Sequence, residues 1–69
     1  MNISARNVLR GTVIKVTPGT VNAEVILELP GGIQIVSMIS KDSAERLGLE
    51  PGREATAIIK ASNVMIAVD

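Results

Sequence analysis

Apolar and polar residues alternate along much of the chain, which predicts β-strands because successive strand residues point to opposite faces. The segment Thr20–Leu29 shows the alternation most clearly. Its apolar face carries Val21, Ala23, Val25, Leu27 and Leu29, and its other face carries Asn22, Glu24, Ile26 and Glu28. Pro30-Gly31-Gly32 follows as a hairpin signal. This segment is therefore predicted to be a half-buried strand that turns directly into the next one.

Four further strands are predicted from shorter or less regular patterns. They cover Val8–Thr17, Ile33–Ile39, Arg53–Ala61 and Asn63–Val68, and the first of them stops at Pro18-Gly19. The strand at Ile33–Ile39 is largely apolar on both faces, which is typical of a strand covered on both sides. Ile3–Arg6 is interpreted as a separate short strand, which in an oligomer could cross to a neighbouring subunit.

The residues Ser40–Gly48 change period and predict a short helix. Ser40 is a good N-cap, and Asp42 suits the first turn. Arg46 suits the last turn, and Gly48 is a natural residue just beyond the end. Five strands with one short helix between the third and fourth predict an all-β fold, a small OB-like five-stranded Greek-key barrel. The 69 residues are predicted to form one domain, 1–69.

Size and composition point to an oligomer. A domain of about 69 residues buries only about 60% of the surface that its unfolded chain exposes, so small folds usually need disulfides, a metal or partner subunits. The chain has no Cys and no His, and it also lacks Phe, Tyr and Trp, the side chains that bury the most area. Association of several copies is therefore the expected source of stability.

Composition also argues against several function classes. Seven basic and seven acidic residues give zero net charge, and without stacking aromatics a nucleic-acid partner is not expected. No apolar run approaches the length of a membrane span, and no signal peptide opens the chain, so a cytoplasmic protein without a membrane partner is predicted. With neither His nor Cys as base or nucleophile, the chain is predicted not to be an enzyme.

Hydroxyls and cations gather in three short segments. Ser40 and Ser43 fall at the start of the predicted helix, Ser4-Ala5-Arg6-Asn7 opens the chain, and Lys60-Ala61-Ser62 ends the fourth strand. Taken singly, each segment is better explained by a helix cap or by solvated charge than by a binding site. A tetrahedral dianion needs many hydrogen-bond donors and compensating charge, which the three segments would supply together.

These segments also resemble the molbindin family of molybdate-binding proteins and the related regulator domains. The matching motifs run in order along nearly the whole chain: Ser4-Ala5-Arg6-Asn7, Gly11, Gly19-Thr20-Val21-Asn22-Ala23-Glu24, Ile39–Leu49, Pro51-Gly52 and Ile58–Ile66. The resemblance implies a Mop or TOBE domain, with dimers assembled into a hexamer (a trimer of dimers). It also implies molybdate or tungstate as the bound ligand, held between subunits, and no organic cofactor.

Residue roles follow from the same resemblance. Ser4 would donate its hydroxyl, and Arg6, beside Ala5, would contribute its backbone N–H and its charge. Lys60 would supply the cation and Ala61 a backbone N–H, while Ser40 and Ser43 of a facing subunit would close the site. Many relatives carry Thr where this chain has Ser40, which keeps the hydroxyl. The set expected to bind the oxyanion is Ser4, Ala5, Arg6, Ser40, Ser43, Lys60 and Ala61.

The family has a second class of site near a symmetry axis. The residues expected for it are Lys15, Gly19, Thr20, Val21 and Asn22, for which a plain β-turn is an equal explanation. The function expected overall is molybdate storage or homeostasis, without a free metal cation. The alternative is a molybdate-sensing regulatory or accessory domain that acts on a transporter or a transcription regulator. An OB-type nucleic-acid binder and a ligand-free structural oligomer are the remaining rivals.

Overall fold

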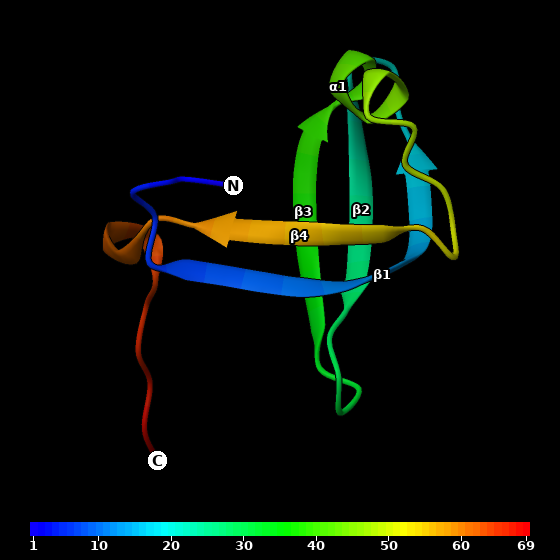
Figure 1. Ribbon diagram of the computed structural model, residues 1–69. Coiled ribbons are helices and arrows are strands. Elements are labelled where there is room, and N and C mark those ends of the chain that lie inside the picture. Colours follow the sequence, from blue (N-terminus) through cyan, green and yellow to red (C-terminus); the bar gives the residue numbers. More distant parts are fainter.

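A curled antiparallel sheet with a short helix at one end makes up most of the computed structural model, which describes all 69 residues (Figure 1). The four strands are β1 (Asn7–Pro18), β2 (Asn22–Glu28), β3 (Gln34–Ser40) and β4 (Glu54–Ile59), in the sheet order β3-β2-β1-β4. Helix α1 (Lys41–Arg46) lies between β3 and β4, and the 3-10 turn η1 (Ala61–Asn63) follows β4. The first four predicted strands are confirmed, with ends displaced by at most two residues.

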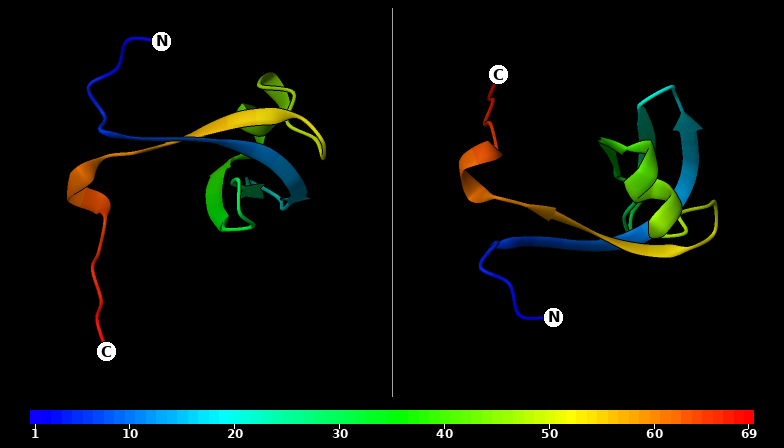
Figure 2. Two further views of the ribbon diagram at one scale, coloured as in Figure 1. Left: turned by 60° about the horizontal axis from the view of Figure 1, so that its bottom comes forward. Right: turned by 90° about the horizontal axis from the view of Figure 1, so that it is seen from above.

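Strand β1 is bent, and its two halves pair with different neighbours. Residues Asn7–Thr12 pair with β4, and Thr12–Pro18 pair with β2. The register shifts between Val13 and Lys15, which marks a β-bulge, and bulges bend the strand that carries them. The bend lets the sheet curl round on itself, as the two further views show (Figure 2).

Gly11 lies at the close crossing of β1 over the end of β2. A Cβ atom placed on this residue would lie 2.4 Å from the carbonyl oxygen of Glu28, which is a backbone atom. Only glycine therefore fits without a shift of one strand.

The core inside the curl is small. Five residues are buried: Val13, Ala23, Val25, Leu27 and Ala44. The inner face predicted for β2 is thus confirmed at Ala23, Val25 and Leu27, and Leu29 packs beside it partly buried. Val21 was expected on the same face but is 71% exposed, because it lies in the turn before β2 begins. So small a core agrees with the expectation that one chain alone gains little from burial.

The sheet has two free edges, β3 and β4, and an apolar groove lies between them. We call it the edge groove: a cavity of about 670 Å³ in which 11 of the 15 lining residues are hydrophobic, among them Ile35, Ile39, Leu49, Ala57 and Ile59. The outer face of β3 is uncovered as well, since Val36 and Met38 are mostly exposed. The expectation that β3 is covered on both sides is therefore wrong for the single chain.

The fifth strand predicted over Asn63–Val68 is also wrong for the single chain. Residues 61–63 form η1, and residues 64–69, which we call the tail, make no strand pairing and run away from the sheet (Figures 1 and 2). The alternation that predicted a strand is present, but η1 directs the tail away from both free edges. Ile3–Arg6, expected as a short strand, is irregular too.

Helix α1 begins and ends as the sequence predicts. Ser40 has extended backbone angles (φ −66°, ψ 148°) and its side chain accepts a hydrogen bond from the backbone N–H of Ser43. Gly48 follows the last turn at φ +65°, a left-handed conformation that favours glycine. No helix in the structure is long and apolar enough to cross a membrane.

Candidate oxyanion site

Two of the three predicted segments meet beside the start of β1. The pairing of Asn7 with Ile59 joins the first strand to the end of the fourth, and the Asn7 side-chain Nδ2 donates to the Ile59 carbonyl at 3.1 Å. Ser4–Arg6 and Lys60–Ser62 are the flanking residues, so they line one hollow of about 550 Å³. We call these six residues the terminal patch.

The terminal patch is cationic and its polar side chains are unengaged. Arg6 and Lys60 both line the hollow, and no carboxylate does. The side chains of Ser4, Arg6, Lys60 and Ser62 make no hydrogen bond or ion pair within the chain. Two cations and two free hydroxyls in one hollow form a set of donors that suits an anion.

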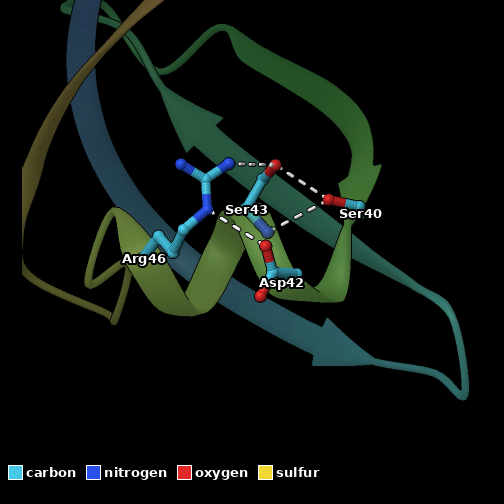
Figure 3. A network of polar contacts seen from close by, with 4 residues as sticks. All are labelled: Ser40, Asp42, Ser43 and Arg46. Atoms are coloured by element: carbon cyan, nitrogen blue, oxygen red, sulfur yellow. Dashed lines mark hydrogen bonds and ion pairs between the residues drawn. The ribbon is translucent and has the colours of Figure 1, made fainter.

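The third segment forms a separate cluster at the start of α1, which we call the helix patch (Figure 3). It contains Ser40, Asp42, Ser43 and Arg46. The Ser40 hydroxyl donates to Ser43 Oγ at 2.8 Å, and Ser40 Oγ accepts from the Ser43 backbone N–H at 3.0 Å. Arg46 Nη2 donates to Ser43 Oγ at 3.2 Å, while Arg46 Nε pairs with Asp42 Oδ2 at 3.0 Å.

The two patches lie at opposite ends of β1 in the same chain. The terminal patch flanks Asn7, where β1 begins, whereas Ser40 pairs with Asn22, just beyond the turn at which β1 ends. A straight strand of the length of β1 would span roughly 36 Å at about 3.3 Å per residue. Even with the bend, the patches of one chain are too far apart to hold one small anion. The structure therefore brings together Ser4, Ala5, Arg6, Lys60 and Ala61, but not Ser40 and Ser43.

The residues predicted for a second site surround the turn between β1 and β2. The Gly19 backbone N–H donates to the Asn22 carbonyl at 2.7 Å, which closes the turn. Gly19, Thr20, Val21 and Asn22 line a shallow hollow of about 450 Å³. Lys15 does not line it, whereas Glu24 does. The hollow thus lacks the cation that was expected and includes a carboxylate, a poorer setting for an anion than the terminal patch.

Arg46 is a polar neighbour of the expected ligand Ser43 that sequence reasoning did not connect with the site. Its position was assigned only to the favourable charge of a last helical turn. The spacing could have predicted these contacts, because residues three and four apart lie on the same helix face. Arg46 therefore reaches both Ser43 and Asp42. No group of three or more His, Cys, Asp or Glu side chains comes together to hold a metal ion.

Comparison with known proteins places the chain in a family. The family model of the TOBE domain matches residues 3–66 of the chain. The chain belongs to the TOBE domain family. Within it, the chain is 54% identical over 66 residues to molybdenum-pterin-binding protein 3 of Clostridium pasteurianum, an alignment that covers 96% of this chain and 97% of the relative. The molbindin resemblance drawn from the sequence is thus confirmed.

Solved structures of proteins with similar sequences share the fold. MopII from Clostridium pasteurianum superposes with a TM-score of 0.92 at 51% identity, over 97% of this chain and 100% of that one. The cytoplasmic molybdate-binding protein ModG, solved with molybdate bound, also gives a TM-score of 0.92, at 54% identity over 94% of this chain and 46% of that one. The prediction of an OB-like fold is therefore confirmed, although one strand of the expected barrel is missing from the single chain.

Proposed function

We propose that the chain binds molybdate and stores it, and that each binding site is shared between two copies of the chain. The observation that carries the proposal is the terminal patch, a hollow with two cations, free hydroxyls and no carboxylate. Relatives that are named for molybdenum or molybdate binding support the choice of ligand. Tungstate, a dianion of the same shape, is expected to bind in the same way.

The chemistry would be reversible capture, with no bond of the ligand broken. The dianion would accept hydrogen bonds from Ser4, from the backbone N–H groups of Arg6 and Ala61, and from the charged group of Lys60. Hydrogen bonds to an ionised acceptor are roughly twice as strong as neutral ones, and the nearby cations offset the negative charge. The same hydrogen bonds would hold the anion in place while it is stored. Catalysis is not part of the proposal.

A second copy would complete the site. Ser40 and Ser43 are the remaining expected ligands, and they lie at the far end of β1 from the terminal patch of their own chain. If the helix patch of one copy faces the terminal patch of another, the hydroxyls of both surround one anion. Each chain would then contribute to two sites, one with each of its ends.

The edge groove and the tail suggest how two copies associate. Val64, Ile66 and Val68 alternate along the tail, and Ile66 and Val68 are 85% and 91% exposed. The edge groove lies between two strands with unpaired edges, so one further apolar strand could fill it. The tail of one copy, placed in the groove of another, would pair with both edges and close the barrel. The hexamer, a trimer of dimers, remains the expected final assembly, and the likeness to ModG supports a cytoplasmic setting.

Titration calorimetry with molybdate tests the proposal, with sulfate as the control anion and native mass spectrometry to count bound anions. The wild-type protein is expected to bind molybdate saturably as an oligomer. Lys60→Ala should weaken binding by roughly tenfold or more, because a charge-assisted hydrogen bond is worth about 1.5–3 kcal/mol. Lys15→Ala removes the same charge outside the terminal patch and should leave this class of sites intact.

Two results would count against the proposal. If the wild-type oligomer binds no molybdate, the serines act only as helix caps and the cations only as surface charge. Equal losses in Lys60→Ala and Lys15→Ala would mean that the anion responds to overall charge and not to the terminal patch.

A further inference from the structure

One side-chain hydrogen bond links the two residues from which the arms of the terminal patch, Ser4–Arg6 and Lys60–Ser62, extend. Asn7 is the first residue of β1, and Ile59 is the last residue of β4. They form the final pair of the β1–β4 ladder, and Asn7 Nδ2 donates to the Ile59 carbonyl at 3.1 Å. The contact therefore lies where both arms leave the sheet.

This hydrogen bond differs from the others that side chains make in the chain. It is partly buried, whereas the others are exposed. A hydrogen bond in surroundings of low dielectric is electrostatically stronger than one in water. The Ile59 carbonyl can only accept, so the amide nitrogen of Asn7 has to face it. Leucine and ionised aspartate are close to asparagine in size, but neither has a donor for this contact.

The Ile59 carbonyl controls the direction in which the chain leaves β4. It belongs to the same peptide unit as the Lys60 N–H, and a peptide unit is planar and trans. A hydrogen bond that holds the carbonyl therefore fixes the plane of that unit. Lys60 follows with extended backbone angles (φ −62°, ψ 134°), and Ala61 begins η1. The position of Lys60 and Ala61, two of the expected ligands, thus depends on the contact that Asn7 makes.

Polar side-chain contacts do not otherwise fix one arm relative to the other. Ser4–Arg6 lies outside the strands, and the polar side chains of both arms make no hydrogen bond within the chain. Each hydrogen bond to an anion needs a donor within about 2.7–3.2 Å of an oxygen. A shift of about 1 Å between the arms would therefore weaken several of these bonds at once. The final pair of the ladder is the point at which the spacing of the donors is set.

We propose that Asn7 is a positioning residue of the oxyanion site, which holds Lys60 and Ala61 at the distance from Ser4–Arg6 that one anion requires. This inference rests on the proposed function and adds to the site a residue that does not touch the anion. Asn7 does not line the hollow of the terminal patch. Its effect reaches the anion through the Ile59 carbonyl and the backbone of Lys60, so its loss should lower the affinity and leave the number of sites unchanged.

Substitutions at Asn7 test the proposal by calorimetric titration of the oligomer with molybdate. Asn7→Leu removes the donor without a change in charge and should weaken binding by about threefold to tenfold, the factor expected for one hydrogen bond. Asn7→Gln keeps the amide donor on a longer side chain and should bind within about twofold of the wild type. The number of anions bound per chain should be the same in all three proteins.

The ion pair between Arg10 and Glu54 provides a control for general weakening of the ladder. It bridges the same two strands away from the terminal patch, with Arg10 Nη2 and Glu54 Oε2 2.6 Å apart. The double variant Arg10→Gln with Glu54→Gln removes this bridge at constant net charge and should leave the affinity within about twofold. The melting temperature of the ligand-free oligomer should fall no further in Asn7→Leu than in this double variant.

The outcomes separate this inference from the proposed function. If the wild-type protein binds molybdate and Asn7→Leu binds equally well, the proposed function stands and the role of Asn7 is refuted. An Asn7→Gln variant as weak as Asn7→Leu would also refute it, because the donor would then not matter. Equal losses of affinity in Asn7→Leu and in the ladder control would mean that the stability of the sheet, and not this contact, governs binding. A wild type that binds no molybdate would instead overturn the proposed function itself.

Discussion

Gly11 and Ser40 are two residues whose identity can be explained by a single contact each. Gly11 lets β1 cross the end of β2 where any Cβ would meet a backbone oxygen, and Ser40 holds the first turn of α1 through one hydrogen bond. The cap was predictable from the sequence because its signature is local. The crossing was not, because it depends on where a distant strand passes.

The substitution Gly11→Ala tests this crossing. We expect it to lower the free energy of unfolding by about 3 kcal/mol, because a backbone atom cannot move aside cheaply. Gly31→Ala is the comparison: Gly31 has φ +92° with no atom near its missing Cβ, so only conformational strain of about 1–2 kcal/mol applies. Urea denaturation at matched protein concentration measures both. An effect at Gly11 no larger than that at Gly31 would contradict the close approach of the two strands.

Among the elements, those with local signals were predicted well and the tail was not. The strands β1 to β4 follow from alternation and from Pro and Gly at their ends, and α1 follows from Ser40 and Gly48. The tail carries the same alternation, but a strand also needs an edge to pair with, and alternation does not say which chain supplies it. For the same reason the sequence suggested three donor segments without showing that one chain unites only two of them.

Substitutions in the tail test its proposed place in the edge groove. Ile66→Asp would put a charge into an apolar groove and is expected to convert the oligomer largely to monomers or dissociating species. Ala67→Asp places the same charge one residue on, where an alternating strand faces the other way, and should be tolerated better. Sedimentation at several protein concentrations measures the difference. Equal behaviour of the two variants would argue against a paired, alternating tail.

On the scale of the whole molecule, binding and assembly are expected to depend on each other. The terminal patch and the helix patch of one chain lie at opposite ends of β1. An anion bound between the terminal patch of one copy and the helix patch of another would therefore link the two copies. A ligand that binds only the assembled state stabilises that state in proportion to the logarithm of its concentration.

Molybdate is therefore expected to raise the melting temperature, and sulfate at equal concentration is not. At about one hundred times the dissociation constant, each site would add about 2.7 kcal/mol. Scanning calorimetry suits the measurement because the chain contains no Trp or Tyr to report unfolding by absorbance or fluorescence. If molybdate does not change the melting temperature of the intact oligomer, assembly does not depend on binding, which would contradict the shared site.

The short connection between β4 and the tail has a consequence for how the molecule could evolve. Only Lys60 and the three residues of η1 separate the last paired residue of β4 from the tail, and they also carry part of the terminal patch. A longer connection would let the tail turn back into the groove of its own chain and produce a self-sufficient monomer. Such a monomer would be more independent, yet it would keep its two half-sites permanently apart. The short length of this connection would thus favour association of two copies over a monomer with a closed sheet.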